Sequence, residues 1–319
     1  MEENPNRTEI PENSGSGISW RPPEPKVRMV LLALLSGCIF FALASTFLSQ
    51  MIVQVGGWDE RLMSGMIDAD ASASERWQMR FLLGIRHFAT FMVAGFVVVW
   101  MFYRGITLPR PSWPDYLRAR EWPGWKNALL SMLLLLVSVP LVLFLFQINK
   151  MLPLPESIRL LEEQANEAIK ALLQMENIGE LLGNLFLIAL LPAVGEELVF
   201  RGVVQQQLMR RIANPWWALI VSAAIFSFFH FQFEGFLPRL LLGFLLGWLY
   251  WETRNFWVPV IAHFFNNGIQ VVAQYASGDD HSVVDLEHDV QVPWFVALLS
   301  AGLVVAVMRI IGKDVRGEK

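Results

Sequence analysis

Residues 178–201 read IGELLGNLFLIALLPAVGEELVFR. The part from Leu181 to Gly195 is almost wholly apolar, and it leads into two adjacent glutamates and then an arginine. An apolar segment of roughly 20 residues is long enough to cross a lipid bilayer as an α-helix. Ionisable groups inside such a segment are unfavourable by several kcal/mol, so they are candidates for function by default. This stretch therefore predicts a membrane helix that carries a polar site.

Further apolar runs of suitable length lie on both sides of Ile178–Phe200. They are Met29–Val55, Phe81–Tyr103, Ala128–Phe146, Trp216–Phe233, Phe236–Trp251, Phe256–Tyr275 and Trp294–Ile311. We expect an all-α fold, in which about eight transmembrane helices form a polytopic membrane helix bundle.

The composition agrees with a membrane protein and excludes other classes. Of 319 residues, 54% are hydrophobic and 17% are charged, whereas a soluble domain has about 25% charged residues. The net charge of -4 provides no global positive field, so we expect the lipid bilayer as a partner and no nucleic acid. Cys38 is the one cysteine in the sequence, which rules out an intrachain disulfide.

The chain is predicted to consist of five segments. Apolar residues recur at helical spacing across Pro155–Met175 with Glu and Lys between them, which indicates an amphipathic helix on the membrane surface or capping the bundle. The polar composition of the first residues indicates a disordered tail. The segments are a disordered cytoplasmic tail (1–28), three transmembrane helices (29–148), the amphipathic connecting helix (149–177), a four-helix core (178–276), and an acidic loop with the last transmembrane helix and a basic cytoplasmic tail (277–319).

Lys and Arg are unevenly shared between the connections. Basic residues cluster in alternate connections, at 104–127, at 210–211, at 254 and after Arg309, whereas 276–292 has acidic residues and no basic one. Because cytoplasmic loops retain positive charge, we expect both termini to be cytoplasmic. The bias is not absolute, since the opposite side also holds Arg61, Arg76, Arg80, Lys150, Arg159 and Lys170.

Glu196, Glu197 and Arg201 are the first candidate site residues. On a helix, Arg201 falls on the same face as Glu197, while adjacent side chains project about 100° apart. Glu197 is therefore the expected partner of Arg201, and Glu196 is left to act as a general base. The alternative is a helix that ends at Val194 and exposes both glutamates at the membrane interface.

Two later apolar runs contain further candidates. His230 lies late in an aromatic helix with Phe226 on the same face, and His263 lies one helical turn before Asn267. Taken alone, His230 is more typical of a hydrogen-bonded packing residue. The pair of His263 and Asn267 is equally compatible with a polar contact between helices.

The depth of these residues favours one shared site. If the fourth and fifth runs form a hairpin centred on Ala213, Glu196 and His230 lie level with each other. The short link near Arg254 places His263 about 14 Å along its helix. We expect a hairpin that protrudes into the cytoplasm and a site buried in the cytoplasmic half of the membrane, opening to the cytoplasmic side.

The motifs Glu-Glu-x-x-x-Arg, Phe-x-x-x-His and His-x-x-x-Asn, in this order and on separate helices, resemble those of the CPBP family of intramembrane proteases. That family includes the type II CAAX prenyl endopeptidases and the bacterial Abi-related proteins. The resemblance covers about Ile178 to Tyr275. It implies an enzyme that hydrolyses a peptide bond of a membrane-associated protein or peptide, with 178–276 as the catalytic core.

The resemblance also implies roles for the candidate residues. Glu196 and His230 would activate water, and His263 and Asn267 would stabilise the oxyanion. If a divalent metal such as zinc is bound, Glu196, His230 and His263 are its ligands. The sequence lacks His-Glu-x-x-His and does not decide this question. We favour a metal-free site, because Asn267 is a poor zinc ligand and a good oxyanion donor.

The remaining histidines receive structural interpretations. His281 and His288 lie in the acidic stretch Asp279–Asp289, which indicates a solvated extracytoplasmic loop. Arg86 and His87 lie near the start of the second apolar run, and we expect them to extend to the membrane interface.

Two other classes of function compete with an enzyme. One is a non-catalytic membrane scaffold or immunity-type binding protein that keeps the polar residues for helix packing. The other, more distant, is a transporter that uses Glu196 as a proton relay. The oligomeric state is not predicted.

The predicted orientation can be tested by cysteine labelling. In a Cys38→Ser background, single cysteines are introduced as Ser282→Cys and Ser112→Cys, and intact cells are treated with an impermeant thiol reagent. Position 282 should react and position 112 should not, because the basic connections are expected in the cytoplasm. The reverse pattern would overturn the topology.

Overall fold

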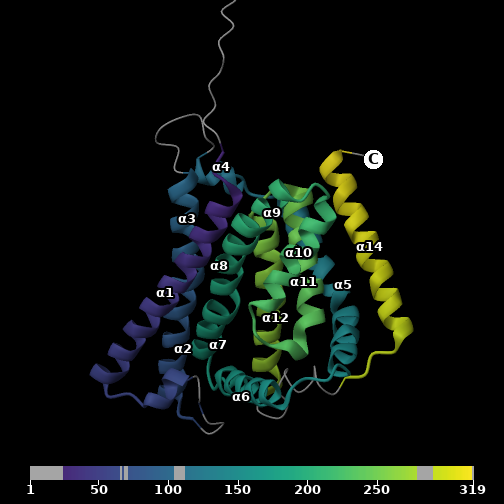
Figure 1. Ribbon diagram of the computed structural model, residues 1–319. Helices are drawn as coiled ribbons and strands as arrows, with labels where there is room; N and C mark the ends of the chain where they lie inside the picture. The colour runs from purple at the N-terminus through teal and green to yellow at the C-terminus, as the bar shows by residue number, and fades with distance from the viewer. Residues whose placement is uncertain (1–23, 65–66, 68–70, 104–111, 279–289, 318–319) are drawn as a thin grey trace, which may run out of the picture.

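The computed structural model describes residues 24–64, 67, 71–103, 112–278 and 290–317 as a bundle of long, roughly parallel helices (Figure 1). Several helices run directly into one another and form continuous rods. The elements are α1 (Val27–Gly56), η1 (Glu60–Ser64), α2 (Ala73–His87), η2 (Phe88–Val93), α3 (Ala94–Tyr103), α4 (Trp113–Leu117), α5 (Trp125–Lys150), α6 (Glu156–Leu173), α7 (Ile178–Asn184), η3 (Leu185–Leu190), α8 (Leu191–Val199), η4 (Phe200–Gln205), α9 (Gln206–Arg211), α10 (Pro215–Phe228), η5 (Phe233–Gly235), α11 (Phe236–Thr253), α12 (Trp257–Ser277) and α14 (Trp294–Arg316).

The polytopic helix bundle expected from the sequence is confirmed. Within the described residues, 6 helices are long and apolar enough to cross a membrane, and α10 is a shorter apolar helix. The 21-residue α12 runs beside them and packs against α5, α8, α11 and η3. Its polar side chains fit this position, since an interior helix can turn them toward neighbouring helices instead of lipid.

The outer helices present apolar side chains to the surroundings. On α1, Leu43 and Phe47 are 67% and 70% exposed, and on α14 Leu298 and Leu299 are exposed to a similar degree. Such a surface would be unfavourable in water but matches hydrocarbon. The bundle is therefore built to sit in lipid, with its polar residues turned inward or gathered at its ends.

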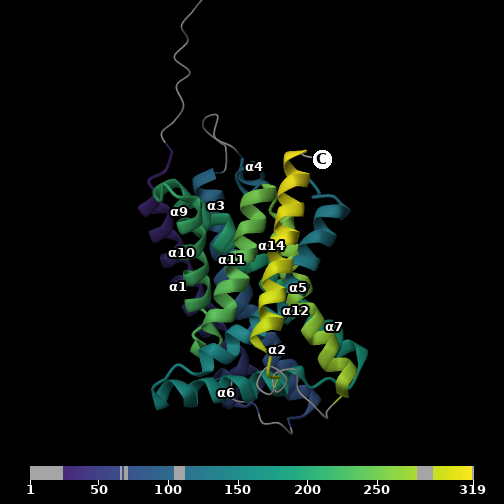
Figure 2. The ribbon, with the colours of Figure 1, turned by 90° about the vertical axis from the view of Figure 1, so that its right-hand side faces the viewer.

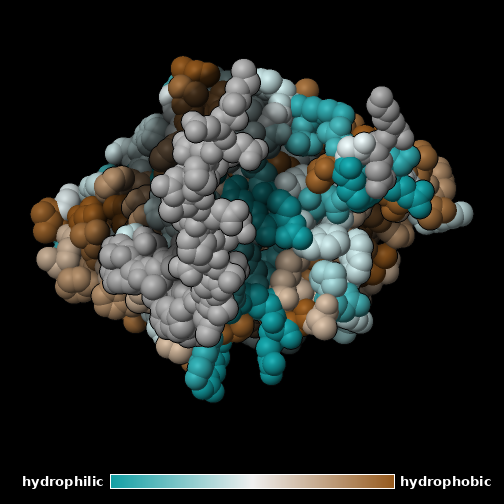
Figure 3. All heavy atoms as spheres, turned by 90° about the horizontal axis from the view of Figure 1, so that it is seen from above, coloured by the Kyte–Doolittle hydropathy of each residue, from teal (hydrophilic) through white to brown (hydrophobic). Residues whose placement is uncertain are grey.

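The basic connections meet at one end of the bundle. Arg210 binds Glu24 just before α1, and Lys126 binds Asp314 near the end of α14. Figure 1 shows the start of α1, α4 and the end of α14 at this end, and Figure 3 shows hydrophilic residues gathered on it. Residues 1–23 and the acidic stretch with His281 and His288 lie outside the described residues.

The hairpin predicted around Ala213 joins α9 to α10. Pro215 opens α10, and the side chain of Asn214 accepts a hydrogen bond from the Trp216 backbone N–H at 2.9 Å. Proline at the first helical position and asparagine before it are both strong helix starts. The turn is therefore encoded locally.

The amphipathic helix expected in Pro155–Met175 is α6, which lies across the other end of the bundle (Figures 1 and 2). Its buried Glu162 accepts hydrogen bonds from the backbone N–H groups of Phe233 and Glu234. From α5, Asn149 bonds both Phe233 and Leu237. These contacts from α6 and α5 hold the connection between α10 and α11 in place.

A buried ion network explains two of the arginines that weakened the charge bias. Glu180 on α7 contacts Arg80 at 2.7 Å and Arg76 at 3.1 Å, and all three side chains are at most 4% exposed. Arg80 also donates to Asn184 and to the Leu172 carbonyl oxygen. These two cations on α2 are neutralised inside the bundle and do not act as free loop charges.

The network gives a stability prediction with an internal control. Glu180→Gln should lower the free energy of unfolding by about 3 to 5 kcal/mol, because both buried arginines lose their shared carboxylate. Glu176 also binds Arg76 but is 69% exposed, so Glu176→Gln should change it by about 1 kcal/mol or less. Thermal unfolding in detergent measures both variants. Equal melting temperatures would show that Glu180 is not the anchor of this network.

Candidate active site

The rod α7 to α9 carries Glu196 near its middle, where α8 is bracketed by the π-helical turns η3 and η4. A third π-helical turn, η2, packs against α8 from the neighbouring rod. Such turns widen the backbone and recur at functional sites. The helix does not end at Val194, and Glu196 and Glu197 are both buried. The alternative of two glutamates exposed at the interface is therefore wrong.

Glu197 and its partner Arg201 connect four helical rods. The Oε1 of Glu197 lies 3.0 Å from Arg201 Nη1 and 2.8 Å from Nδ1 of His263 on α12. Arg201 also donates to the Gly243 carbonyl oxygen on α11 and lies over the ring of Phe226 on α10. The predicted pair of Glu197 and Arg201 is present, and the carboxylate additionally holds a histidine that the sequence did not connect to it.

Glu196 faces two imidazoles. Its Oε2 is 3.8 Å from His230 Nε2 and 3.9 Å from His263 Nε2. This oxygen is buried without a hydrogen-bond partner. Two hydrogen bonds of about 2.8 Å that meet at one oxygen atom span such a separation. The gap is therefore the right size for one bridging water or one substrate oxygen.

His230 lies just after α10 and not within it. The helix ends at Phe228, and Phe231 has a left-handed backbone with φ 53°. The imidazole turns back so that Nδ1 donates to the Phe226 carbonyl oxygen at 2.8 Å. Nε2 is thereby directed toward Glu196.

The hydrogen bonds at Nδ1 decide what the two imidazoles can do at Nε2. In His230 the partner of Nδ1 is a carbonyl oxygen, and in His263 it is the Glu197 carboxylate. Both partners accept, so each Nδ1 carries the hydrogen, and in the neutral ring Nε2 is an acceptor. A neutral His263 therefore cannot donate to an oxyanion from Nε2, which changes the role predicted for it. It can donate there as an imidazolium.

Asn267 lies further along α12 and faces η3. Its Nδ2 donates to the Ile188 carbonyl oxygen at 3.4 Å, and its Oδ1 accepts from Asn266. Within the described residues it forms no hydrogen bond with Glu196 or with the two imidazoles. The structure thus brings Glu196, His230 and His263 together and places Asn267 one turn away.

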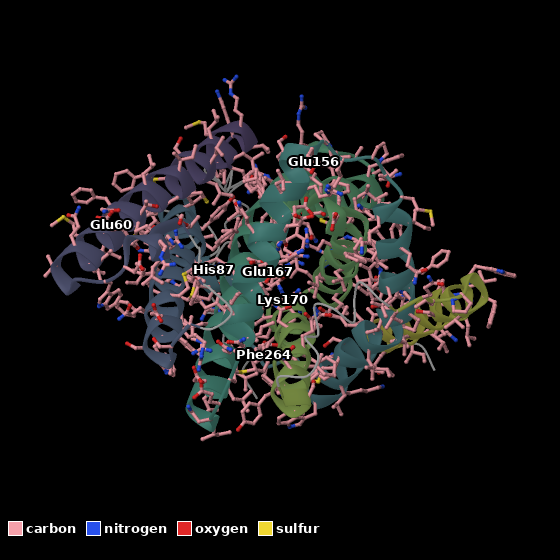
Figure 4. All side chains as sticks on the ribbon, turned by 90° about the horizontal axis from the view of Figure 1, so that it is seen from below. Glu60, His87, Glu156, Glu167, Lys170 and Phe264 are labelled. Carbon is pink, nitrogen blue, oxygen red and sulfur yellow. The ribbon has the colours of Figure 1, made fainter. Side chains whose placement is uncertain are left out.

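The expectation for Arg86 and His87 is wrong for His87. The sequence predicts an apolar run that begins at Phe81, but the helical rod spans Ala73–Tyr103, which puts His87 at its centre. In the view from the α6 end, His87 lies on the inner side of α2 (Figure 4). Arg86 instead reaches η1, which precedes α2, and donates to the Met63 carbonyl oxygen at 3.4 Å.

His87 packs directly against the helix of Glu196. Its ring is stacked on Phe91 with a centroid distance of 4.6 Å. A methyl group placed on Gly195 would lie 3.4 Å from His87 Nε2, so the absence of a side chain at Gly195 allows this approach. An ionisable residue in the middle of a membrane helix is a candidate for function. The sequence does not single out His87 in this way, because the predicted run begins too close to it.

The side chains around Glu196 do not form a zinc site as they stand. Neighbouring ligand atoms of tetrahedral zinc are about 3.3 Å apart, whereas the two imidazole nitrogens are 3.8 and 3.9 Å from Glu196 Oε2. In the part of the chain that the structure describes, no group of three His, Cys, Asp or Glu residues is arranged to hold a metal ion. No step of the chemistry is therefore assigned to a metal.

Comparisons with known proteins point to the same segment. Residues 178–269 match the family described as "Type II CAAX prenyl endopeptidase Rce1-like", which confirms the resemblance seen in the motifs. The chain is 32% identical over 79 residues to "Putative membrane peptidase YdiL" of Bacillus subtilis (strain 168), covering 25% of this chain and 32% of that protein. It is 30% identical over 105 residues to "Uncharacterized protein YpbD" of the same organism, covering 31% of this chain and 51% of that protein.

The matched stretches thus span about a third and about half of these two relatives. No solved structure matches the chain. The family match supports a membrane protease of the CAAX type in general terms.

The two adjacent glutamates should behave differently on mutation. Glu197→Ala leaves buried Arg201 without its carboxylate and should destabilise the protein by about 3 to 5 kcal/mol. Glu196→Gln removes an oxygen that has no hydrogen-bond partner, so it should leave the protein folded. Melting temperatures in detergent compare the two variants directly. Equal stability would contradict the separate roles assigned to them.

Proposed function

We propose that this protein is an intramembrane endopeptidase that hydrolyses a peptide bond of a membrane-associated protein or peptide. The observation that carries the proposal is the buried, unpartnered Oε2 of Glu196, which faces Nε2 of both His230 and His263. A buried oxygen without a partner is unfavourable, and it is expected where a water or substrate must be held.

The water is activated by proton transfer to Glu196. A water placed between Glu196 Oε2 and His230 Nε2 donates to both, since each is an acceptor. As its oxygen attacks the carbonyl carbon, one proton passes to Glu196 and the carbonyl π bond becomes an oxyanion. Collapse of this intermediate breaks the C–N bond, and Glu196 returns the proton to the leaving amine. One water is consumed, and a carboxylic acid and an amine are formed.

The oxyanion is stabilised by Asn267 and by His263 in its protonated form. In that form His263 keeps its Nδ1–H on the Glu197 carboxylate, 2.8 Å away, and donates to the oxyanion from Nε2. Asn267 reaches the oxyanion when its bond of 3.4 Å to Ile188 opens on substrate binding. Glu197 and Arg201 contact no reacting atom in this mechanism, so they are positioning residues for His263.

The proposed location follows from charge. The basic connections, which gather at one end of the bundle, are proposed to be cytoplasmic, as are both termini. The site is proposed to open to the same side, and its substrates are proposed to reach it from the membrane or its surface.

The enzyme is tested by comparing the purified protein with its Glu196→Gln variant on a broad set of membrane peptides in detergent and in vesicles. Cleavage should be detectable for the wild type and fall by at least about 10²-fold in the variant, because general-base catalysis is lost. A Met101→Leu variant, altered at an exposed position of α3, is the control for handling and should cleave like the wild type. Equal results for wild type and Glu196→Gln would favour a non-catalytic scaffold.

We also propose that catalysis needs no metal. The purified active protein should contain substoichiometric zinc by elemental analysis, and exhaustive chelation should leave cleavage intact. Stoichiometric metal that is lost together with activity, and that restores activity when added back, would overturn the metal-free mechanism while leaving the protease assignment in place.

A further inference from the structure

His87 carries a second unpartnered polar atom beside Glu196. Its Nε2 is buried and has no hydrogen-bond partner. Within the described residues, the ring is held by stacking on Phe91 and by packing against Gly195, not by hydrogen bonds. A buried polar atom without a partner in a tightly packed interior calls for a reason, and a group that bonds to a substrate is one.

The surroundings of His87 are those of the active site. Gly195, against which Nε2 packs, directly precedes Glu196, and the π-helical turn η2 begins at the next residue after His87. Glu196 in turn faces Nε2 of both His230 and His263. Two imidazoles therefore face the Glu196 carboxylate, and a third, from another rod, packs against the residue just before it.

His87 differs from the other two imidazoles in what it can donate. His230 and His263 have their Nδ1 hydrogen committed to an acceptor, so their Nε2 atoms accept when neutral. No protein group fixes the tautomer of His87. Among the three described histidines, it alone can be neutral and still present an N–H at Nε2.

We propose that His87 is a further catalytic residue, whose neutral imidazole donates an Nε2–H hydrogen bond to the carbonyl oxygen of the scissile peptide bond. This inference rests on the proposed protease function. The bond strengthens as the carbonyl oxygen becomes an oxyanion, so it favours the transition state over the bound substrate. His87 gives up no proton in the reaction, and the balance of the hydrolysis is unchanged.

A catalytic role of His87 can be distinguished from a structural role, because Nε2 forms no hydrogen bond in the free protein. His87→Phe keeps an aromatic ring that can stack on Phe91 and removes only the donor. No protein hydrogen bond at Nε2 is lost, so the melting temperature should stay close to that of the wild type. His87→Gln replaces the ring but keeps an N–H donor at a similar reach.

The kinetic test compares kcat and KM for wild type, His87→Phe, His87→Gln and Glu196→Gln on one cleaved peptide. His87→Phe should lower kcat by about 10²- to 10³-fold with little change in KM, as expected for loss of one oxyanion donor. His87→Gln should recover at least tenfold of that loss and keep the wild-type shape of the pH profile, because the residue donates without titrating. A kcat of His87→Phe within threefold of wild type, while Glu196→Gln is inactive, would overturn the role of His87 and leave the protease standing. Absence of any Glu196-dependent cleavage would remove both proposals.

A second measurement does not depend on turnover. Nitrogen-15 NMR of histidine-labelled protein in detergent at neutral pH, with the His87 signals assigned from their loss in His87→Phe, reports the tautomer. His87 should be neutral with hydrogen on Nε2. A neutral ring with hydrogen on Nδ1, or a charged ring, would contradict the inference even in an active protein.

Discussion

The buried Glu197 carboxylate is the interaction on which the site depends. In the apolar interior of a bundle a charge is tolerated only when it is paired and hydrogen-bonded. Glu197 meets this requirement with Arg201 from its own rod and His263 from α12, while Arg201 continues to α11 and α10 through Gly243 and Phe226. Together with Arg201, one carboxylate thus ties together four rods around the site and fixes which nitrogen of His263 is protonated.

The position of His230 depends on a second set of contacts at the α6 end of the bundle. The connection after α10 is held by Glu162 on α6 and by Asn149 on α5. With that connection fixed, the chain can turn through the left-handed Phe231 and direct His230 back into the bundle. An amphipathic helix at the end of the bundle therefore contributes to the geometry around Glu196.

The buried polar groups of the described residues differ in whether they find partners. In the network of Arg76, Arg80 and Glu180, the guanidinium groups and the carboxylate find partners, as expected of groups that serve packing. Glu196 Oε2 and His87 Nε2 are buried without partners, and they lie on facing rods that pack closely at Gly195. Unsatisfied groups are unfavourable for stability. Ser49, Asn127 and Gln205 also carry such atoms, but Glu196 and His87 bring two of them, a carboxylate and an imidazole, to one place in the candidate site.

The sequence alone determined the features that depend on neighbours along the chain. Apolar runs of bilayer length predicted the bundle, Asn214 and Pro215 encode the α9–α10 turn, and helical spacing paired Glu197 with Arg201, because these relations need only local geometry. The tertiary structure decided the rest. The true start of the α2 rod moved His87 from the interface to the interior, and Glu180 neutralised arginines 100 and 104 positions before it in the chain. A turn after α10 set the tautomer of His230, and a contact from another rod set that of His263. These outcomes depend on which rods pack together and on which of their residues lie level with one another along the bundle. The periodicity of a single helix carries no information about either.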